Sequence, residues 1–300
     1  MIRFAAIMML MLSLPAVARA QVSREVELPY SGMTLLGAFV VPDERALDGD
    51  VVLLTHGTLA HKDMELIEGL QLALAERGVA SLAHSLSLAI DRRRGMYDCA
   101  QPHRYRHEDA VDEIAAWIDW LQGQGAGRVT LLGHSRGGNQ VAWYASEAAD
   151  PPFAGVVLLA PATGASQQAV ALRYRERFGA DLAPVLKRAA ALVAAEKGAT
   201  LMSVPGFLYC EGGKAAAASV VSFYGTEPRR DTPALIPAIA VPVLVIAGSA
   251  DQVVPDVADR FRPLVDGEKV RLAVVEDADH MFLDFYLEDA ADLIVDFLRR

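Results

Sequence analysis

Short runs of consecutive apolar residues recur along the chain, separated by stretches with a helical pattern. Six such runs, of which the second is the weakest, occupy residues 51–55, 79–86, 128–133, 153–161, 241–248 and 270–276. A continuous apolar run of this length is typical of a strand that is buried on both faces of a parallel sheet. Because these runs alternate with helical stretches, we predict an α/β fold with a mostly parallel sheet and helices on both faces.

Three further segments complete the predicted core. Residues 22–41 alternate between apolar and polar positions around a Ser-Gly turn, which predicts an antiparallel hairpin at one edge of the sheet. Residues 107–122 place Ile114 and Ile118 on one apolar stripe, which is typical of an amphipathic helix. The C-terminal residues 282–300 are predicted to form a closing helix.

One interval is too long for a single crossover helix. About 80 residues separate Pro161 from Val241. An apolar stripe within this interval predicts at least one helix, and residues 204–213 read as a loop. We therefore predict a helical insertion at 163–239, within a core formed by 21–162 and 240–300.

The N-terminus has the pattern of an export signal. Arg3 precedes an apolar run at 4–14, and small residues at Ala18 and Ala20 indicate cleavage after Ala20. Loss of residues 1–20 removes two arginines and takes the formal net charge from −10 to −12. Since no long apolar run follows, we predict no membrane span in the mature chain, which we expect to be periplasmic or secreted.

The net charge bears on the possible partners of the protein, and the predicted export bears on its two cysteines. The acidic balance argues against nucleic acid as a partner, because a phosphate backbone requires a basic face. An oxidising compartment permits a disulfide between Cys99 and Cys210, and two buried free thiols are the alternative. The oligomeric state cannot be inferred from the sequence.

A serine lies at the junction between the apolar run 128–133 and the helical stretch after it. The sequence GHSRG, from Gly133 to Gly137, has the pattern G-x-S-x-G. A tight strand-to-helix turn strains the central residue and crowds the positions on either side of it, so glycine is needed at both. The start of the helix also favours negative charge there. We therefore predict that Ser135 is a nucleophile.

A serine nucleophile needs a base, and the base needs a carboxylate to orient it. His280 follows the last predicted strand, and Asp251 follows the strand before it. Both would therefore reach the edge of the sheet at which parallel strands end and such sheets bind ligands. We predict a triad of Ser135, His280 and Asp251. Four other carboxylates compete with Asp251 for its role: Asp98, Asp256, Asp277 and Asp279.

With these motifs the chain resembles the α/β-hydrolase family. The resemblance covers roughly residues 25–300 and depends on the sequences THGT, GHSRGG, GSADQVVP and ADHMF. It implies an α/β-hydrolase fold with a cap domain in the long insertion. It also implies an oxyanion hole formed by the backbone N–H groups of Thr58 and Arg136, in a loop shaped by His56 and Gly57. Such a site requires neither a metal nor a cofactor.

Other histidines and arginines have more than one interpretation. His134 is expected to have a structural role. His103 and His107 have the spacing of a helical metal-binding pair, but no third ligand is indicated. Arg92–Arg94 forms either a solvated or salt-bridged face or a cationic rim that attracts an anionic substrate.

These patterns predict an exported serine hydrolase that acts on a small-molecule carboxylic ester or related acyl compound. An aspartate at position 135 would instead have indicated dehalogenase or epoxide hydrolase chemistry. The alternatives that remain are an aminopeptidase of the proline-iminopeptidase type, a lyase, a cofactor-free haloperoxidase and a thioesterase. A non-catalytic binding protein on the same fold is the alternative from a different class.

Overall fold

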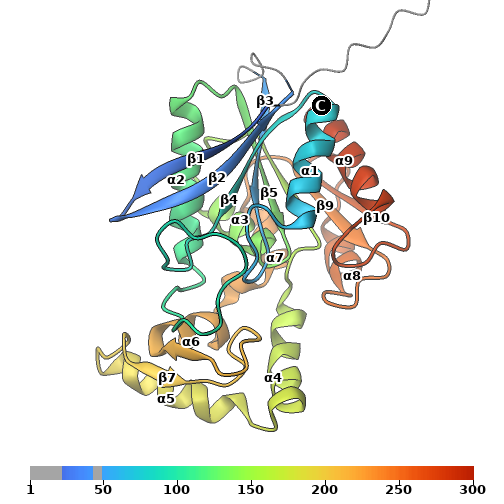
Figure 1. Cartoon of the computed structure of the whole chain (residues 1–300). Coiled ribbons are helices and arrows are strands. Elements are labelled where there is room, and N and C mark those ends of the chain that lie inside the picture. The colour runs from blue at the N-terminus through green and yellow to red at the C-terminus, as the bar shows by residue number, and fades with distance from the viewer. Residues whose placement is uncertain (1–21, 43–48) are drawn as a thin grey trace, which may run out of the picture.

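The computed structural model describes residues 22–42 and 49–300, so the predicted export signal at 1–20 lies outside the described residues. Within them, one sheet of eight strands runs in the order β1-β2-β4-β3-β5-β6-β9-β10 (Figure 1). Its strands are β1 (Val22–Tyr30), β2 (Met33–Val41), β3 (Asp50–Thr55), β4 (Ala80–Ser85), β5 (Arg128–His134), β6 (Gly155–Leu159), β9 (Val243–Gly248) and β10 (Val270–Val275).

The hydrophobic pattern correctly predicts this sheet. The strands from β4 to β10 pair in parallel with their neighbours, whereas β2 is antiparallel to both β1 and β4. Every residue of β4 and β6 is buried, as expected for strands covered on both faces. The predicted N-terminal hairpin is confirmed and forms one edge of the sheet.

Helices cover both faces of the sheet. The helices α1 (Glu65–Glu76) and α9 (Phe285–Leu298) pack together on one face (Figure 1). On the other face lie α2 (Asp109–Gly123), α3 (Arg136–Glu147) and α8 (Val257–Phe261). Apolar side chains of α2, including Ile114, Trp117 and Ile118, are fully buried there.

Between β6 and β9 the chain leaves the sheet and forms most of a second layer, beyond the carboxyl ends of the strands (Figure 1). This insertion contains α4 (Gly164–Phe178), α5 (Leu182–Ala194), β7 (Leu201–Ser203), β8 (Lys214–Ala216), α6 (Ala217–Tyr224), η2 (Pro228–Arg230), α7 (Thr232–Leu235) and η3 (Ile236–Ala238). A further short helix, η4 (Arg262–Leu264), follows α8 in the core.

The insertion contains two short strands that the prediction of a helical insertion with a loop at 204–213 does not include. Its strands β7 and β8 pair as an antiparallel hairpin around the predicted loop. Each has only three residues, too few to show an alternating pattern in the sequence. At the end of the insertion, Leu235, Ile236 and Ile239 pack into the main core beside α3.

A long loop between β4 and α2, residues 86–108, connects this insertion to the core. A disulfide joins Cys99 of the loop to Cys210 of the insertion. The backbone N–H of His103 donates to Lys214 O at 2.7 Å, and Ala216 N–H donates to His103 O at 2.8 Å. The disulfide spans 111 residues, for which chain entropy contributes roughly 4–5 kcal/mol to stability. The insertion is therefore held against the core by covalent and backbone contacts.

The same loop and insertion share a hydrophobic cluster of their own. Tyr97 and Tyr105 of the loop pack with Phe207 and Phe223 of the insertion, and Leu59 contributes from the segment after β3. This cluster lies above the end of the sheet where the predicted site residues gather.

In the described part of the chain, no helix is both long enough and apolar enough to cross a membrane.

Candidate active site

Ser135 occupies a strained turn between β5 and α3. Its φ of 55° lies in the left-handed region, which a residue with a side chain adopts only when its surroundings enforce it. A Cβ added at Gly133 would lie 2.4 Å from the carbonyl oxygen of Gly137. A Cβ added at Gly137 would lie 2.4 Å from the carbonyl oxygens of Thr55 and His56. The glycines on either side of Ser135 therefore allow β3, β5 and α3 to approach closely.

Two loops bring a histidine and a carboxylate together beside this turn. His280 follows β10, Asp251 follows β9, and Nδ1 of His280 donates to Oδ2 of Asp251 at 2.8 Å. The other carboxylate oxygen accepts from the N–H groups of Val253 and Val254 at 2.7 and 2.9 Å. Both His280 and Asp251 are buried. The arrangement fixes the imidazole with Nδ1 protonated, which leaves Nε2 as the basic nitrogen.

The carboxylate of Asp251 is held in its ionised form. Burial is the largest influence on its pKa and acts to raise it. The hydrogen bonds from His280 and from the backbone of Val254 and Val253 outweigh burial and hold the pKa below its usual value. Asp251 is therefore negatively charged at neutral pH and can stabilise an imidazolium.

Of the four competing aspartates, three have carboxylates that accept hydrogen bonds from other described groups. Asp256 accepts from the hydroxyl of Thr163, and Asp279 accepts from the N–H of Met281. Asp98 accepts from the N–H of Ala100 in an exposed turn. The backbone N–H of Asp277 donates to Ser249 Oγ. Within the described residues, only Asp251 forms a hydrogen bond with the ring of His280.

His134 connects the serine turn to the histidine loop. Its Nε2 donates to the backbone carbonyl of His280 at 2.9 Å, and the two imidazole rings lie 4.8 Å apart. Burial, followed by the nearby His280, lowers the pKa of His134 to about 3, so its ring is neutral. In this conformation no hydrogen bond joins Ser135 Oγ to His280 among the described residues. Such a contact is often long without substrate.

The loop after β3 lies directly against the serine. A Cβ added at Gly57 would lie 3.2 Å from Cβ of Ser135, so only glycine leaves this approach unhindered. His56 is buried beneath the loop, and its Nδ1 donates to Gly57 O at 2.8 Å. The side chain of Arg136 reaches across and donates from Nε to Thr58 Oγ1 at 2.8 Å. Thr58 and Arg136 therefore lie on adjoining segments that flank Ser135.

Arg93 is a part of the site that sequence reasoning missed. Its guanidinium is buried and donates to three backbone carbonyls, those of Leu86 at 2.6 Å, Ala60 at 2.7 Å and Gly95 at 2.8 Å. It also lies 3.0 Å from Nε2 of His56, which accepts because Nδ1 is the donor. Burial lowers the pKa of Arg93 to about 10. Arg93 thus fixes the loop next to Ser135, and nothing in the sequence distinguishes it from its neighbours.

The neighbours of Arg93 contradict the interpretation of Arg92–Arg94 as a cationic rim. Arg92 pairs with Glu27 and Arg94 pairs with Glu25, both on β1 at the edge of the sheet. Their charges are compensated, and neither side chain lines the cavity described below. The salt-bridged alternative is therefore correct for these two residues.

The histidines with metal-like spacing have separate surroundings. The His103 ring packs against the rings of Tyr97, Phe207 and Phe223, with centroids 4.9 to 5.4 Å away. His107 donates from Nε2 to Asn139 Oδ1 at 2.8 Å. In the described ranges, no group of three or more His, Cys, Asp or Glu residues is placed to hold a metal ion.

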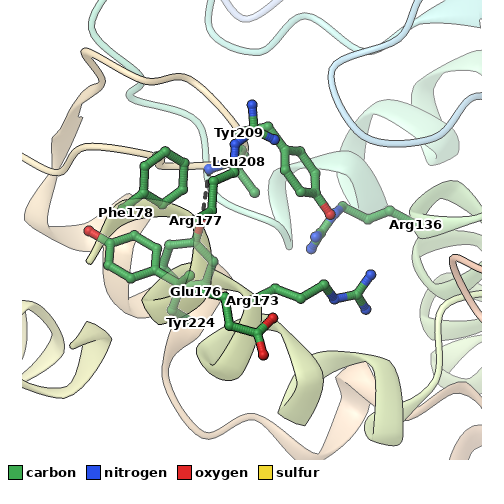
Figure 2. A pocket seen from close by; sticks show the side chains of 10 residues that line it. Arg136, Arg173, Glu176, Arg177, Phe178, Leu208, Tyr209 and Tyr224 are labelled. Atoms are coloured by element: carbon green, nitrogen blue, oxygen red, sulfur yellow. Dashed lines mark hydrogen bonds between the residues drawn. The ribbon is translucent and has the colours of Figure 1, made fainter. Parts of the chain in front are cut away.

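A cavity of about 340 Å³ lies between α3 and the insertion (Figure 2). Its walls come from α3, α4, the loop between β7 and β8, and α6, and they consist of Arg136, Arg173, Tyr174, Glu176, Arg177, Phe178, Gly206, Leu208, Tyr209 and Tyr224. Ser135 is not part of the wall, but the next residue, Arg136, is. The side chain of Arg136 thus extends from the serine turn to a cavity whose other walls come from the insertion.

Acid should destabilise the fold through a buried histidine near this site. His84 of β4 is fully buried and hydrogen-bonded to Thr55 Oγ1 at 2.9 Å, and burial lowers its pKa to about 3. Unfolded His84 takes up a proton below its usual pKa of 6.5, whereas folded His84 does not. Its contribution to stability is therefore lost as the pH falls from 6.5 towards 3, by about 2 kcal/mol between pH 7 and pH 5.

Urea unfolding at pH 7 and pH 5 tests this expectation. The loss of unfolding free energy between the two pH values should be smaller in His84→Gln than in the wild type by that amount. An equal loss in both proteins would mean that His84 is protonated in the folded state. The exposed Asp289→Asn serves as the control variant.

A model of the alpha/beta hydrolase family matches residues 51–297. The chain is similar to Est1E from Butyrivibrio proteoclasticus, solved with ferulic acid, at 18% identity and a TM-score of 0.65, covering 91% of this chain and 97% of that one. It is similar to the alpha/beta hydrolase GrgF from Penicillium sp. sh18, at 16% identity and a TM-score of 0.67, covering 93% and 98%.

A third neighbour is an esterase from Pyrococcus furiosus, at 18% identity and a TM-score of 0.59, covering 93% of this chain and 90% of that one. At these identities the neighbours demonstrate the shared fold. The match to the family model spans most of the chain, including Ser135, Asp251 and His280. The chain therefore belongs to the alpha/beta hydrolase family.

Proposed function

We propose that this protein is a serine hydrolase that cleaves a carboxylic ester through an acyl-enzyme. The observation that carries the proposal is the hydrogen-bonded pair of His280 and Asp251 beside the strained turn at Ser135. An imidazole oriented by a buried carboxylate next to a serine in a strained turn is the arrangement that activates a hydroxyl. The esterases among the structural neighbours support ester hydrolysis in general.

In the first half of the reaction, Ser135 Oγ attacks the acyl carbon of the ester. As the new C–O bond forms, the hydroxyl proton moves to Nε2 of His280, and Asp251 stabilises the resulting imidazolium. The tetrahedral intermediate then collapses and its bond to the alcohol oxygen breaks. The imidazolium returns its proton to that oxygen, so the alcohol leaves neutral and an acyl-serine remains.

Negative charge develops on the carbonyl oxygen during attack. The backbone N–H groups of Thr58 and Arg136 flank Ser135, and we assign them as its donors. Each donor of this kind typically contributes about 10²–10³ to the rate. Within the described chain neither N–H donates to another backbone group. The hydrogen bonds of Arg93 and His56 keep the loop with Thr58 in place.

Water completes the cycle by the same route in reverse. His280 takes a proton from the water as the hydroxide attacks the acyl carbon, and the bond to Ser135 Oγ breaks. The proton passes to Ser135, which restores the hydroxyl, and the carboxylic acid is released. Every proton is accounted for by His280, so these steps require no metal or cofactor.

The proposal includes export and a cap. A cleaved signal before residue 21 would deliver the chain to an oxidising compartment, with which the Cys99–Cys210 disulfide is compatible. We propose that residues 163–239 act as a cap over the site, and that the disulfide limits how far this cap opens. A small-molecule substrate then enters beside α4 rather than through a wide cleft.

A panel of substrates tests the proposal. We expect the purified mature protein to hydrolyse p-nitrophenyl esters. Aminoacyl-anilides and acyl thioesters should be cleaved much more slowly or not at all. Faster cleavage of the anilides would favour the peptidase, and faster cleavage of thioesters would favour the thioesterase. Absence of all three activities would favour the non-catalytic binding protein.

A further inference from the structure

The cavity beside Ser135 contains a buried arginine without a carboxylate partner. Arg136 is 9% exposed, and Nε is its only side-chain nitrogen with a hydrogen bond to a described residue, the acceptor being Thr58 Oγ1. Nη1 has no partner in the described part of the chain. The guanidinium lies 5.3 Å from the centre of the Phe223 ring, which holds it in place without neutralising it.

Other arginines of the described chain that lie in or near the insertion do have carboxylate partners. Arg229 pairs with Glu147 and Glu227, and Arg260 pairs with Asp231 and Asp256. Burying a cation without a counter-ion is unfavourable, so an anion bound in the cavity would stabilise Arg136.

A second cation lies near Arg136. Arg230 is also buried, and burial, followed by the charge of Arg136, lowers the pKa of Arg230 to about 10. Like Arg136, Arg230 forms no ion pair with a described carboxylate, and its Nε has no partner. The surroundings of Arg136 therefore increase the need for an anion rather than supply one.

The side chains around the cavity present this charge to its interior. Figure 2 shows Arg136 entering from α3, with the phenol oxygen of Tyr209 directed towards its guanidinium. Arg173 extends from α4 towards the same side of the cavity (Figure 2). In that view the side chain of Arg173 lies between Arg136 and Glu176, the single carboxylate of the wall. Arg177, which also belongs to the wall, lies 3.8 Å from Glu211, and Glu211 is outside the wall.

We propose that this cavity is a binding site for a carboxylate on the substrate, with Arg136 as its main ligand and Arg173 as a second. The inference rests on the proposed esterase function and specifies its substrate class: an anionic ester with an aromatic or apolar body. Guanidinium is suited to carboxylate because it offers paired donors in one plane. The body of the substrate would pack against Phe178, Leu208 and Tyr224.

Arg136 would then contact the substrate at two separate places. The backbone N–H of Arg136 faces the developing oxyanion, and its guanidinium binds the remote carboxylate. Its Nε bond to Thr58 also links the segments that bear the two oxyanion donors. A bound carboxylate would therefore place the scissile carbonyl relative to Ser135.

Two pairs of rigid esters test this inference, each pair differing only in carboxylate against carboxamide. The pair 4-acetoxybenzoate and 4-acetoxybenzamide places the group on the alcohol side. The pair methyl 4-carboxybenzoate and methyl 4-carbamoylbenzoate places it on the acyl side. Each kcat/KM is divided by the rate of hydroxide-catalysed hydrolysis of the same ester, which removes differences in intrinsic reactivity.

We expect the wild type to prefer the carboxylate in one of the two pairs by about 10- to 100-fold, the effect of hydrogen bonds to a charged group. In Arg136→Met this preference should fall to within a few-fold of unity, mainly through KM. Arg136→Lys, which keeps the charge without the planar fork, should also lower it and replaces Arg136→Met if that variant does not fold. Arg173→Gln should lower it a few-fold.

The matched control is Arg175→Gln. Arg175 is an exposed arginine of α4, the helix that also contains Arg173, and it pairs with Asp181. This variant should keep the wild-type preference. A wild-type preference near unity in both pairs would overturn the inference, as would a preference that persists in the Arg136 variants. Neutral esters would still be hydrolysed in that case, so the proposed function would stand.

Calorimetry tests the opposite case, in which the anion site exists but the protein is not an esterase. In at least one of the two pairs, the carboxylate ester should bind Ser135→Ala more tightly than its carboxamide, by a factor that falls when Arg136→Met is added. This result without turnover by the wild type would retain the anion site and reject the esterase. Equal binding of carboxylate and carboxamide in both pairs would reject the anion site irrespective of catalysis.

Discussion

Replacing Ser135 with alanine is expected to lower kcat for p-nitrophenyl esters by about 10⁶, the effect of removing the nucleophile from a measured serine triad. The reason is chemical: without Oγ no acyl-enzyme forms, and His280 has no hydroxyl to activate. The alanine should be tolerated in the turn, since it removes one oxygen from a site already held by its glycine neighbours. Steady-state kinetics at saturating ester measures the effect.

The control is Ser203→Ala, which alters an exposed serine of β7 and should leave kcat unchanged. A Ser135→Ala protein that is folded, as judged by circular dichroism, and retains more than about one hundredth of the wild-type kcat would be incompatible with this nucleophile.

Replacing Asp251 with asparagine is expected to lower kcat by about 10⁴ while the fold persists. The amide oxygen can still accept from Val253 and Val254, but its NH₂ group faces Nδ1 of His280. Nδ1 must then accept, which places the proton on Nε2 and leaves His280 unable to take one from Ser135. The imidazolium also loses its counter-charge.

Asp277→Asn and Asp279→Asn are the matched controls, because these carboxylates lie in the same loop as His280 without a hydrogen bond to its ring. Each should change kcat by less than about threefold, as expected for an exposed group outside the reaction. If either lowered kcat by orders of magnitude while Asp251→Asn did not, the acid of the triad would have to be reassigned.

The parts of this fold that the sequence predicts are those fixed by local sterics and burial. The apolar runs mark strands that are covered on both faces, and their residues are indeed buried. Gly133 and Gly137 are readable because a side chain at either would collide with backbone only 2.4 Å away. Chain order alone also places residues that follow β9 and β10 at one edge of the sheet.

The parts that the sequence does not predict depend on contacts between distant segments. Arg92, Arg93 and Arg94 are identical in type. Only the folded chain pairs the first and last with glutamates of β1 and buries the middle one against the loop that follows β3. Similarly, the guanidinium of Arg136 is a candidate binding group only because the insertion forms most of the cavity wall around it. Nothing local encodes either distinction.

The hairpin of β7 and β8 illustrates the same limit in the backbone. Its strands LMS and KAA are short, and β8 is stabilised in part by His103 from a loop more than a hundred residues earlier. Propensity over three residues is too weak to indicate a strand. The insertion therefore resembles a set of helices in the sequence, although its connection to the core runs through this hairpin and the disulfide.

Covalent labelling tests the central claim most directly, because it reports an activated serine without any assumption about the substrate. Intact-mass spectrometry after treatment with a fluorophosphonate should show one adduct on the wild type, and peptide mapping should place it on Ser135. Ser135→Ala should show none, and His280→Ala should react far more slowly. An adduct that persists in Ser135→Ala, or a wild type that remains unmodified, would contradict the assignment of Ser135 as the nucleophile.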